Sequence, residues 1–238
     1  GYTMKKYLLF IILSFLTTFH ATASVTMLGN RIIYNENSRD KTLIFSNDNE
    51  TPALVQIWTD VNNPKSSPDN ADGPFVAVPA IFNITDNSKQ NVRLTYTGGK
   101  LPGDRESIFY FNYLSIPSVK KEDADKNKLM IVVTNRMKLF YRPAKIGNDT
   151  ADVINKLEIS RQGNMLDVRN PSPFYASVSS AALSAGNKQG QIENTTMIAP
   201  YSSAKWSLPV GYQSGNVTLL LGVINDYGVE KTRSITLN

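Results

Sequence analysis

Few residue types in this 238-residue sequence can do chemistry. There is no cysteine, which excludes a disulfide framework, a zinc ribbon and a thiol nucleophile. The single histidine, His20, lies in a segment that we expect to be removed, which also excludes Ser-His-Asp catalysis and histidine-ligated metals. No phosphate loop or dinucleotide fingerprint is present, and Asp123 and Asp125 lack the rest of a calcium loop. The sequence therefore predicts no enzyme, no metal or cofactor, and no small-molecule substrate.

Charged residues are the remaining candidates for chemistry. The chain has 25 basic and 20 acidic residues, and Lys5 and Lys6 belong to the segment that we expect to be lost. An excess this small, without a basic run interleaved with aromatic residues, does not indicate nucleic-acid binding. A lone Lys or Arg is ordinarily a solvated surface charge, so a role for any one of them has to come from its position.

Residues 1–23 have the pattern of a secretory signal peptide together with upstream residues. Lys5 and Lys6 precede an apolar run at 7–19, and small residues follow at 21–23. A membrane anchor needs about 20 apolar residues, and this run is shorter. We expect cleavage near Ala23–Ser24 and an exported protein that is stabilised by core packing alone.

The elements that must position the charged residues have the pattern of short β-strands. Val92, Leu94 and Tyr96 alternate with polar residues, the period of a half-buried strand. No stretch keeps helical spacing over three turns. Further strands are expected in the first half at 43–45, 53–58, 108–114 and 129–133.

A polar segment at 144–149 has the composition of a linker, and a second series of strands follows it. This series is expected at 165–168, 174–178, 204–208, 217–223 and 234–237. Short strands separated by regular turns are typical of β-sandwiches. We therefore predict an all-β chain with two sandwich domains, 24–143 and 150–238.

Four segments resemble the periplasmic pilus chaperones of the chaperone–usher pathway, the PapD-like family. They lie at 101–112, 136–144, 170–175 and 224–228, and their order and separation also match. The resemblance implies two immunoglobulin-like domains arranged as an L with a cleft between them. It also implies that the chain lends a strand to a pilus subunit that lacks one of its own.

By this resemblance, the donated strand is 129–133 with its continuation to Lys138. Leu129, Ile131 and Val133 share one face, and each would give roughly 1.5–3 kcal/mol on burial in the subunit groove. The alternative is that these three side chains belong to the core of their own domain. Against it, the residues between them, at 130 and 132, are also apolar, so both faces of the strand need cover.

The resemblance places two cations in the cleft, where they would hold the C-terminal carboxylate of the subunit. These are Arg31, on the first strand, and Lys138. A carboxylate accepts charge-assisted hydrogen bonds from both groups. Pinning the subunit terminus would fix which side chain of the donated strand enters which subunit pocket.

Glu106, Arg142 and Asp226 match an ion network that, in the family, holds the two domains at their angle. The resemblance also implies a surface facing the outer-membrane usher at Pro52, Leu54 and Pro79. Ala80 stands where a second proline is common. The short connector 117–129 and the absence of a cysteine pair resemble the short-loop branch of the family.

The sequence thus predicts an ATP-independent periplasmic chaperone that folds pilus subunits and delivers them to an outer-membrane usher. The exposed donor edge also favours self-association of the free chaperone. The alternative is an exported fibre subunit or adhesin with the same kind of fold. Two domains, the absence of cysteine and the cation pair favour the chaperone.

Overall fold

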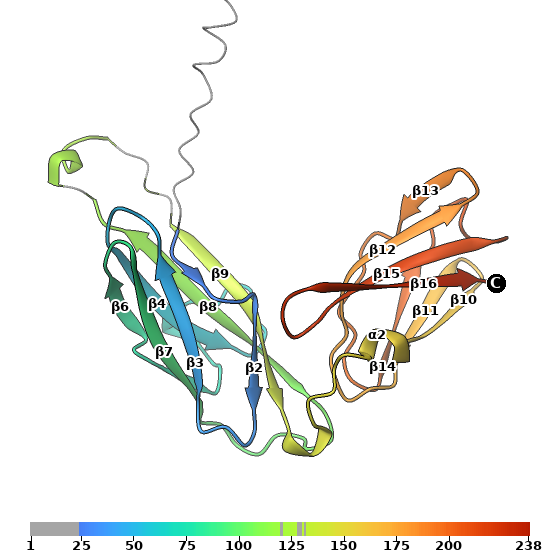
Figure 1. Ribbon diagram of the computed structural model, residues 1–238, viewed down its shortest axis with the longest axis horizontal. Helices are drawn as coiled ribbons and strands as arrows, with labels where there is room; N and C mark the ends of the chain where they lie inside the picture. The colour runs from blue at the N-terminus through green and yellow to red at the C-terminus, as the bar shows by residue number, and fades with distance from the viewer. Residues whose placement is uncertain (1–23, 120, 128–129, 131) are drawn as a thin grey trace, which may run out of the picture.

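A computed structural model describes residues 24–119, 121–127, 130 and 132–238, apart from the side chain of Asp123. The expected signal peptide, His20 included, and the donor-strand residues Leu129 and Ile131 lie outside the described residues. The described chain forms two β-sandwich domains, which meet near the connecting segment and diverge from it (Figure 1). The predicted all-β, two-domain fold is confirmed. No helix in the described ranges is long and apolar enough to cross a membrane.

The first domain packs a four-stranded sheet against a five-stranded sheet. The four-stranded sheet has the order β1 (Thr26–Met27), β3 (Lys41–Asn47), β7 (Ser88–Tyr96) and β5 (Phe75–Val78). The five-stranded sheet has the order β2 (Arg31–Asn35), β9 (Val133–Arg142), β8 (Ser107–Pro117), β4 (Ala53–Asp60) and β6 (Ile81–Ile84).

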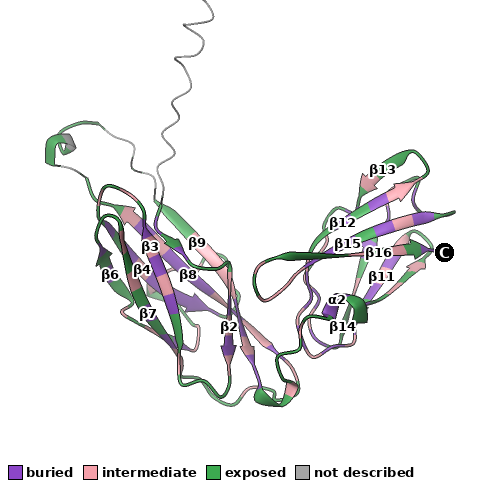
Figure 2. Cartoon of the chain, in the orientation of Figure 1, coloured by how far each residue is buried: buried purple, intermediate pink, exposed green. Residues whose placement is uncertain are grey.

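Alternating side chains build the core between these sheets. The predicted alternation in β7 is present, since Val92 and Leu94 are fully buried while Asn91 and Arg93 are exposed. Aromatic rings fill the centre, where Phe45 meets Tyr113 edge to face with ring centroids 5.1 Å apart. Buried residues line the inner faces of both sheets (Figure 2).

The second domain packs a three-stranded sheet against a four-stranded sheet. The first sheet has the order β10 (Glu158–Gln162), β11 (Met165–Asn170) and β14 (Ser202–Ser207). The second has the order β13 (Lys188–Gln191), β12 (Ser177–Ala185), β15 (Val217–Ile224) and β16 (Glu230–Leu237). A single helical turn, α2 (Val153–Lys156), buries Val153 and Ile154 in this core. Short 3-10 turns lie at Pro68–Asn70, Lys121–Asp123 and Ala144–Ile146.

Among the described residues, the strand predicted at 129–133 is present only at Val133, since Met130 and Val132 lie outside β9. The strand predicted at 174–178 is wrong in its first half, because β12 begins only at Ser177. The backbone before it is committed to other partners. The Asn170 side chain donates to the Phe174 carbonyl at 2.7 Å, and the Tyr175 N–H donates to Glu106 of the first domain at 2.8 Å. These groups are therefore not free to form a sheet ladder.

Strand β9 is paired unequally on its two sides. It pairs with β8 along its whole length, from Val133 to Tyr141. On the other side β2 runs parallel to it and reaches only Lys138 to Arg142. Within the described residues, the stretch 133–137 therefore has an unpaired edge, which can accept another strand.

Candidate functional site

The start of β9 and the residues just before it carry apolar side chains that their own domain leaves exposed. Val133 is 40% exposed, whereas Leu139, on the same face of the same strand, is fully buried. Met130 and Val132, just before the strand, are 47% and 45% exposed. The inner face of β9 is thus buried in the core at Leu139 and exposed to solvent at Val133, so the core of its own domain does not bury Val133.

The open stretch ends at the two cations that the sequence singled out. Arg31 and Lys138 are direct partners in the parallel β2–β9 pairing, so their side chains leave the sheet side by side. Both are half-buried, and within the described part of the chain neither forms an ion pair. Arg31 donates to the Ser177 hydroxyl at 3.2 Å, and its Nε is buried without a hydrogen-bond partner.

Burial and mutual repulsion perturb both groups. Burial lowers the pKa of Lys138, and the neighbouring Arg31 charge lowers it further. Burial also lowers the pKa of Arg31, while the carboxylates of Asp226 and Glu106 oppose that shift. Two adjacent cations with unused donors and a desolvation cost constitute a site for an anion.

The other two basic side chains of β9 are neutralised. Arg136 forms an ion pair with Asp60, which is fully buried at the end of β4. Arg142 pairs with both Glu106 and Asp226. The charge that β2 and β9 leave available is therefore confined to Arg31 and Lys138.

The sequence-predicted trio of Glu106, Arg142 and Asp226 is brought together between the domains. Arg142 Nη1 and Nη2 donate to the two Asp226 carboxylate oxygens at 2.7 and 2.9 Å. Its Nε and Nη2 donate to Glu106 Oε2 at 3.1 and 2.9 Å. Asp226 belongs to the β15–β16 turn, while Glu106 and Arg142 belong to the first domain. The trio thus joins the domains through bidentate hydrogen bonds.

Further groups complete this network. The second carboxylate oxygen of Glu106 accepts the Tyr175 N–H, and the Thr150 hydroxyl donates to Asp226 at 3.1 Å. Burial pushes the pKa of Asp226 upward, but hydrogen bonds from Arg142 and Thr150 outweigh burial and hold the pKa below its ordinary value. The interface therefore holds an ionised carboxylate.

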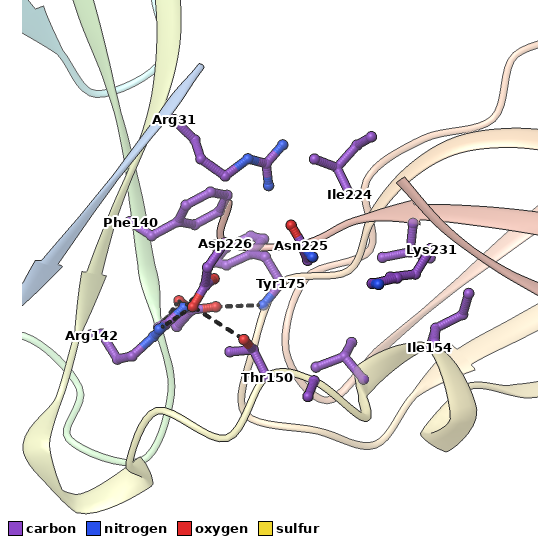
Figure 3. A pocket seen from close by; sticks show the side chains of 14 residues that line it. Arg31, Phe140, Arg142, Thr150, Ile154, Tyr175, Ile224, Asn225, Asp226 and Lys231 are labelled. Carbon is purple, nitrogen blue, oxygen red and sulfur yellow. Dashed lines mark hydrogen bonds and ion pairs between the residues drawn. The ribbon is translucent and has the colours of Figure 1, made fainter. Parts of the chain in front are cut away.

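A small open cleft lies beside this network, lined by both domains, and Glu106, Arg142 and Asp226 form part of its lining. Arg31 and Phe140 reach it from the first domain, and Ile224 and Lys231 from the second (Figure 3). The rings of Phe140 and Tyr175 meet across the boundary with centroids 5.6 Å apart. Lys138 lies beside Arg31 on the next strand but outside this lining. Cationic and apolar side chains therefore line the cleft together with the carboxylates of Glu106 and Asp226.

Comparison with known proteins decides what class of molecule carries this cleft. Residues 24–147 match the model of the PapD N-terminal domain, from pili and flagellar-assembly chaperones. Residues 152–235 match the C-terminal domain of the pili assembly chaperone PapD. The chain belongs to this family. It is a pilus-assembly chaperone, and such chaperones are not enzymes, as the residue types predicted.

Individual relatives agree with this assignment. The chaperone protein HifB of Haemophilus influenzae is 37% identical over 241 residues, covering 97% of each chain. The crystal structure of the Pseudomonas aeruginosa CupB2 chaperone superposes with a TM-score of 0.75 at 28% identity, covering 90% of this chain and all of that one. The SafB chaperone of Salmonella enterica, in complex with the SafA pilin, gives a TM-score of 0.71 at 26% identity, covering 90% of this chain and 95% of that one. The chaperone prediction is confirmed over the fibre-subunit alternative.

The predicted usher-facing residues of this pilus chaperone lie on the far side of the first domain, on and beside β4 and β6. Pro52 and Leu54 are exposed and Pro79 is half-buried. Leu54 and Ile81, which is 58% exposed, lie on the same outer face of the five-stranded sheet. Together they form an exposed apolar surface, which marks a candidate protein contact.

Sequence analysis missed several residues of the chaperone cleft. Ser177 and Thr150 contact the charged groups but are ordinary polar residues without a local motif. Tyr175 lies in the matched segment 170–175, but it contacts Glu106 through its backbone N–H, which no side-chain pattern predicts. The Asp60–Arg136 pair was also missed, because its two members are far apart in the sequence. Within the described ranges, no group of three or more His, Cys, Asp or Glu residues could hold a metal ion.

Proposed function

We propose that this pilus chaperone captures subunits by pairing the open edge of β9 with the subunit and placing its apolar side chains in the subunit groove. Arg31 and Lys138 bind the C-terminal carboxylate of the subunit and so set the register of the added strand. The observation that carries the proposal is the geometry of β9, whose unpaired edge at 133–137 begins at the exposed Val133 and ends at two cations that have no ion pair among the described residues. The SafA–SafB complex supports it, because there a chaperone of this fold holds a pilin.

The energetic logic requires both parts of the site. Burial of exposed apolar side chains supplies affinity, at roughly 25 cal/mol per Å². Apolar burial alone tolerates several registers, because it is non-directional. Charge-assisted hydrogen bonds to the carboxylate are directional and select one of them.

The test is capture in cells. The chain is co-expressed with pilus subunits encoded beside its gene and purified, and mass spectrometry measures what co-purifies. Arg31→Ala and Lys138→Ala are expected to lose the subunits while remaining folded. Arg93→Ala, which removes an exposed cation from β7 of the same domain, serves as the control and should retain them. Normal subunit recovery with both cleft variants would contradict the proposed anchor.

The same proposal covers location and delivery. We place the working chaperone in the periplasm after cleavage near Ala23–Ser24, and we assign usher contact to the surface around Pro52, Leu54 and Pro79. N-terminal sequencing of the periplasmic protein tests the first point. The second is tested by Leu54→Asp, which should leave subunit capture intact but abolish binding of the loaded chaperone to the usher in detergent.

A further inference from the structure

Arg136 and Lys138 are two cations near the proposed anchoring site, and a subunit carboxylate bound at one or the other would set a different register of the added strand. The two residues lie on the same face of β9, opposite Asn112 and Tyr110 of β8. Two residues of strand separate their Cα atoms by about 7 Å. Both side chains carry a positive charge, so the strand offers a carboxylate two cations to choose from.

The spacing of two residues makes Arg136 a more serious competitor than a cation at most other positions. A slip of one residue turns every side chain of a strand to the opposite face, so the apolar pattern itself rejects it. A slip of two residues keeps the apolar side chains facing the groove and only moves each into the neighbouring pocket. Burial therefore discriminates poorly against a subunit anchored on Arg136.

We propose that Asp60 removes this competitor, so that the subunit carboxylate finds one cationic site and one register on β9. This inference rests on the proposed function, since it concerns how that anchor achieves specificity. Asp60 is fully buried, and both of its carboxylate oxygens pair with the Arg136 guanidinium, Oδ1 at 3.0 Å from Nη2. Arg136 also donates to the Asn63 carbonyl at 3.2 Å.

The direction of the Arg136 side chain matches this role. It crosses β8 toward the end of β4, and its guanidinium lies 4.0 Å from the centroid of the Tyr110 ring. It therefore turns away from the open edge of β9, where the subunit would lie. Lys138, by contrast, stands next to Arg31 with no anionic partner among the described residues.

Hydrogen bonds to both of its carboxylate oxygens keep Asp60 ionised. Its Oδ1 accepts the Asn62 and Asn63 N–H groups at 2.9 and 2.7 Å, and its Oδ2 accepts Ser66 Oγ and Asn112 Nδ2 at 2.8 and 2.7 Å. Burial alone would raise the pKa of Asp60, but these bonds and Arg136 lower it to about 2. The neutralisation of Arg136 thus persists across the physiological pH range.

The experiment traps the register directly. The chain has no cysteine of its own, so Asn135→Cys supplies a single thiol in the open stretch 133–137. The probe is a pilus subunit that co-purifies with the chain, carrying one cysteine at a time along its last strand. The chaperone thiol is placed in four backgrounds: wild type, Asp60→Asn, Arg136→Gln and the double variant. For each background, mass spectrometry identifies the subunit position whose cysteine forms a disulfide with the chaperone thiol.

We expect one trapped position with the wild-type background and with Arg136→Gln. Asp60→Asn should add a second product, with the coupled subunit residue two positions closer to its C-terminus. The double variant should return to the single wild-type product, because the freed cation is gone. A purely structural role of the ion pair predicts no such rescue, since the double variant still lacks the pair.

A second variant guards against failure of Asp60→Asn to fold, which thermal unfolding by circular dichroism would reveal. Thr134 is exposed on the same face as Arg136 and takes no part in the Asp60 cluster. Thr134→Arg adds an unneutralised cation there and should also yield a second trapped register.

Two results would overturn the inference without touching the proposed function. One is a single unshifted product from Thr134→Arg and from folded Asp60→Asn. The other is loss of capture with Arg136→Gln, which would make Arg136 part of the anchor. Absence of any trapped product with the wild-type background would instead contradict the proposed function itself, and the inference with it.

Discussion

At the residue scale, Arg31 and Lys138 differ from Arg136 and Arg142 in having no carboxylate partner among the residues that the structure describes. An unpaired, half-buried cation costs stability, because it loses hydration without gaining an ion pair. The lowered pKa of Lys138 expresses this cost, since its charged form is disfavoured in the folded chain. The free chaperone therefore carries a local penalty that a bound carboxylate relieves.

The first prediction follows from this penalty. Lys138→Met keeps most of the aliphatic side chain and removes the charge, so the Tm should stay the same or rise. Loss of one charge-assisted bond, worth about 1.5–3 kcal/mol, should weaken subunit binding about 10- to 100-fold. Calorimetric unfolding and titration with a purified subunit measure the two effects. A clear fall in Tm together with unchanged binding would assign Lys138 a structural role instead.

The second prediction concerns Asp226, whose pKa Arg142 and Thr150 hold below its ordinary value despite burial. A depressed pKa stabilises the folded chain above the ordinary value, and that contribution is lost as the pH falls through the lowered pKa. Unfolding free energy should therefore drop in strong acid. Asp226→Asn should flatten this part of the pH profile and cost about 1–3 kcal/mol near neutral pH.

Denaturant unfolding between pH 2 and pH 7 provides the measurement for this prediction. Glu158→Gln is a suitable control, because Glu158 forms an exposed ion pair with Arg169 on the outer sheet of the same domain. Exposed pairs contribute little, so the control profile should match that of the wild type. An unchanged acid limb in Asp226→Asn would contradict the role given to the network.

At the element scale, β9 changes from a core strand to an open edge along its own length. The third prediction compares two positions on one face of it. Val133→Asp should leave the Tm nearly unchanged, because Val133 is 40% exposed. It should abolish detectable capture, because a charge would enter an apolar groove. Leu139→Ala, at a fully buried site, should instead cost about 2–5 kcal/mol of stability.

Co-purification and thermal unfolding of both variants test this contrast. Global unfolding of Val133→Asp would place Val133 in the core of its own domain. Ile131→Asp, outside the described residues, carries the same expectation of weaker capture without unfolding. Self-association of the free chaperone through this open edge stays a prediction. Sedimentation of the wild-type chain and of Val133→Asp tests it.

The local alternation of apolar and polar residues predicted where strands form better than it predicted which strands pair. The alternation around Val92 and Leu94 identifies β7 because both side chains are fully buried. Periodicity carries no information on which strands pair, so only the resemblance to a family placed Arg31 and Lys138 together, and the parallel pairing that sets them side by side came from the structure. The strand predicted at 174–178 failed because the backbone N–H of Tyr175 bonds across the domain boundary.

At the scale of the whole molecule, the β15–β16 turn contacts the first domain at more than one point. Beyond the ion network, the Asn30 side chain donates to the Gly228 carbonyl at 3.4 Å. Gly228 lies in the β15–β16 turn with φ of 76°, and a Cβ there would come within 2.3 Å of Asn30 Oδ1. Asn30 immediately precedes Arg31, so this contact joins the second domain to the strand that carries the proposed anchor.

The fourth prediction uses this contact. Gly228→Ala should displace the Asn30 side chain and weaken subunit binding about five-fold, the value of one neutral hydrogen bond. Gly215→Ala is a matched control, because Gly215 has the same φ of 76° with nothing within 4 Å of an added Cβ. Both variants should lose similar stability through backbone strain. Equal binding by the two variants would contradict a coupling through Asn30.

The central claim is that the chaperone lends a strand to a subunit and holds the subunit by its terminal carboxylate. The most direct measurement is calorimetric titration with a synthetic peptide of the last strand of a co-purified subunit, as the free acid and as the C-terminal amide. We predict that the wild-type chain binds the acid about 10- to 100-fold more tightly than the amide. The Arg31→Gln/Lys138→Gln variant should bind both equally weakly. Equal affinity of the wild-type chain for acid and amide would contradict the account.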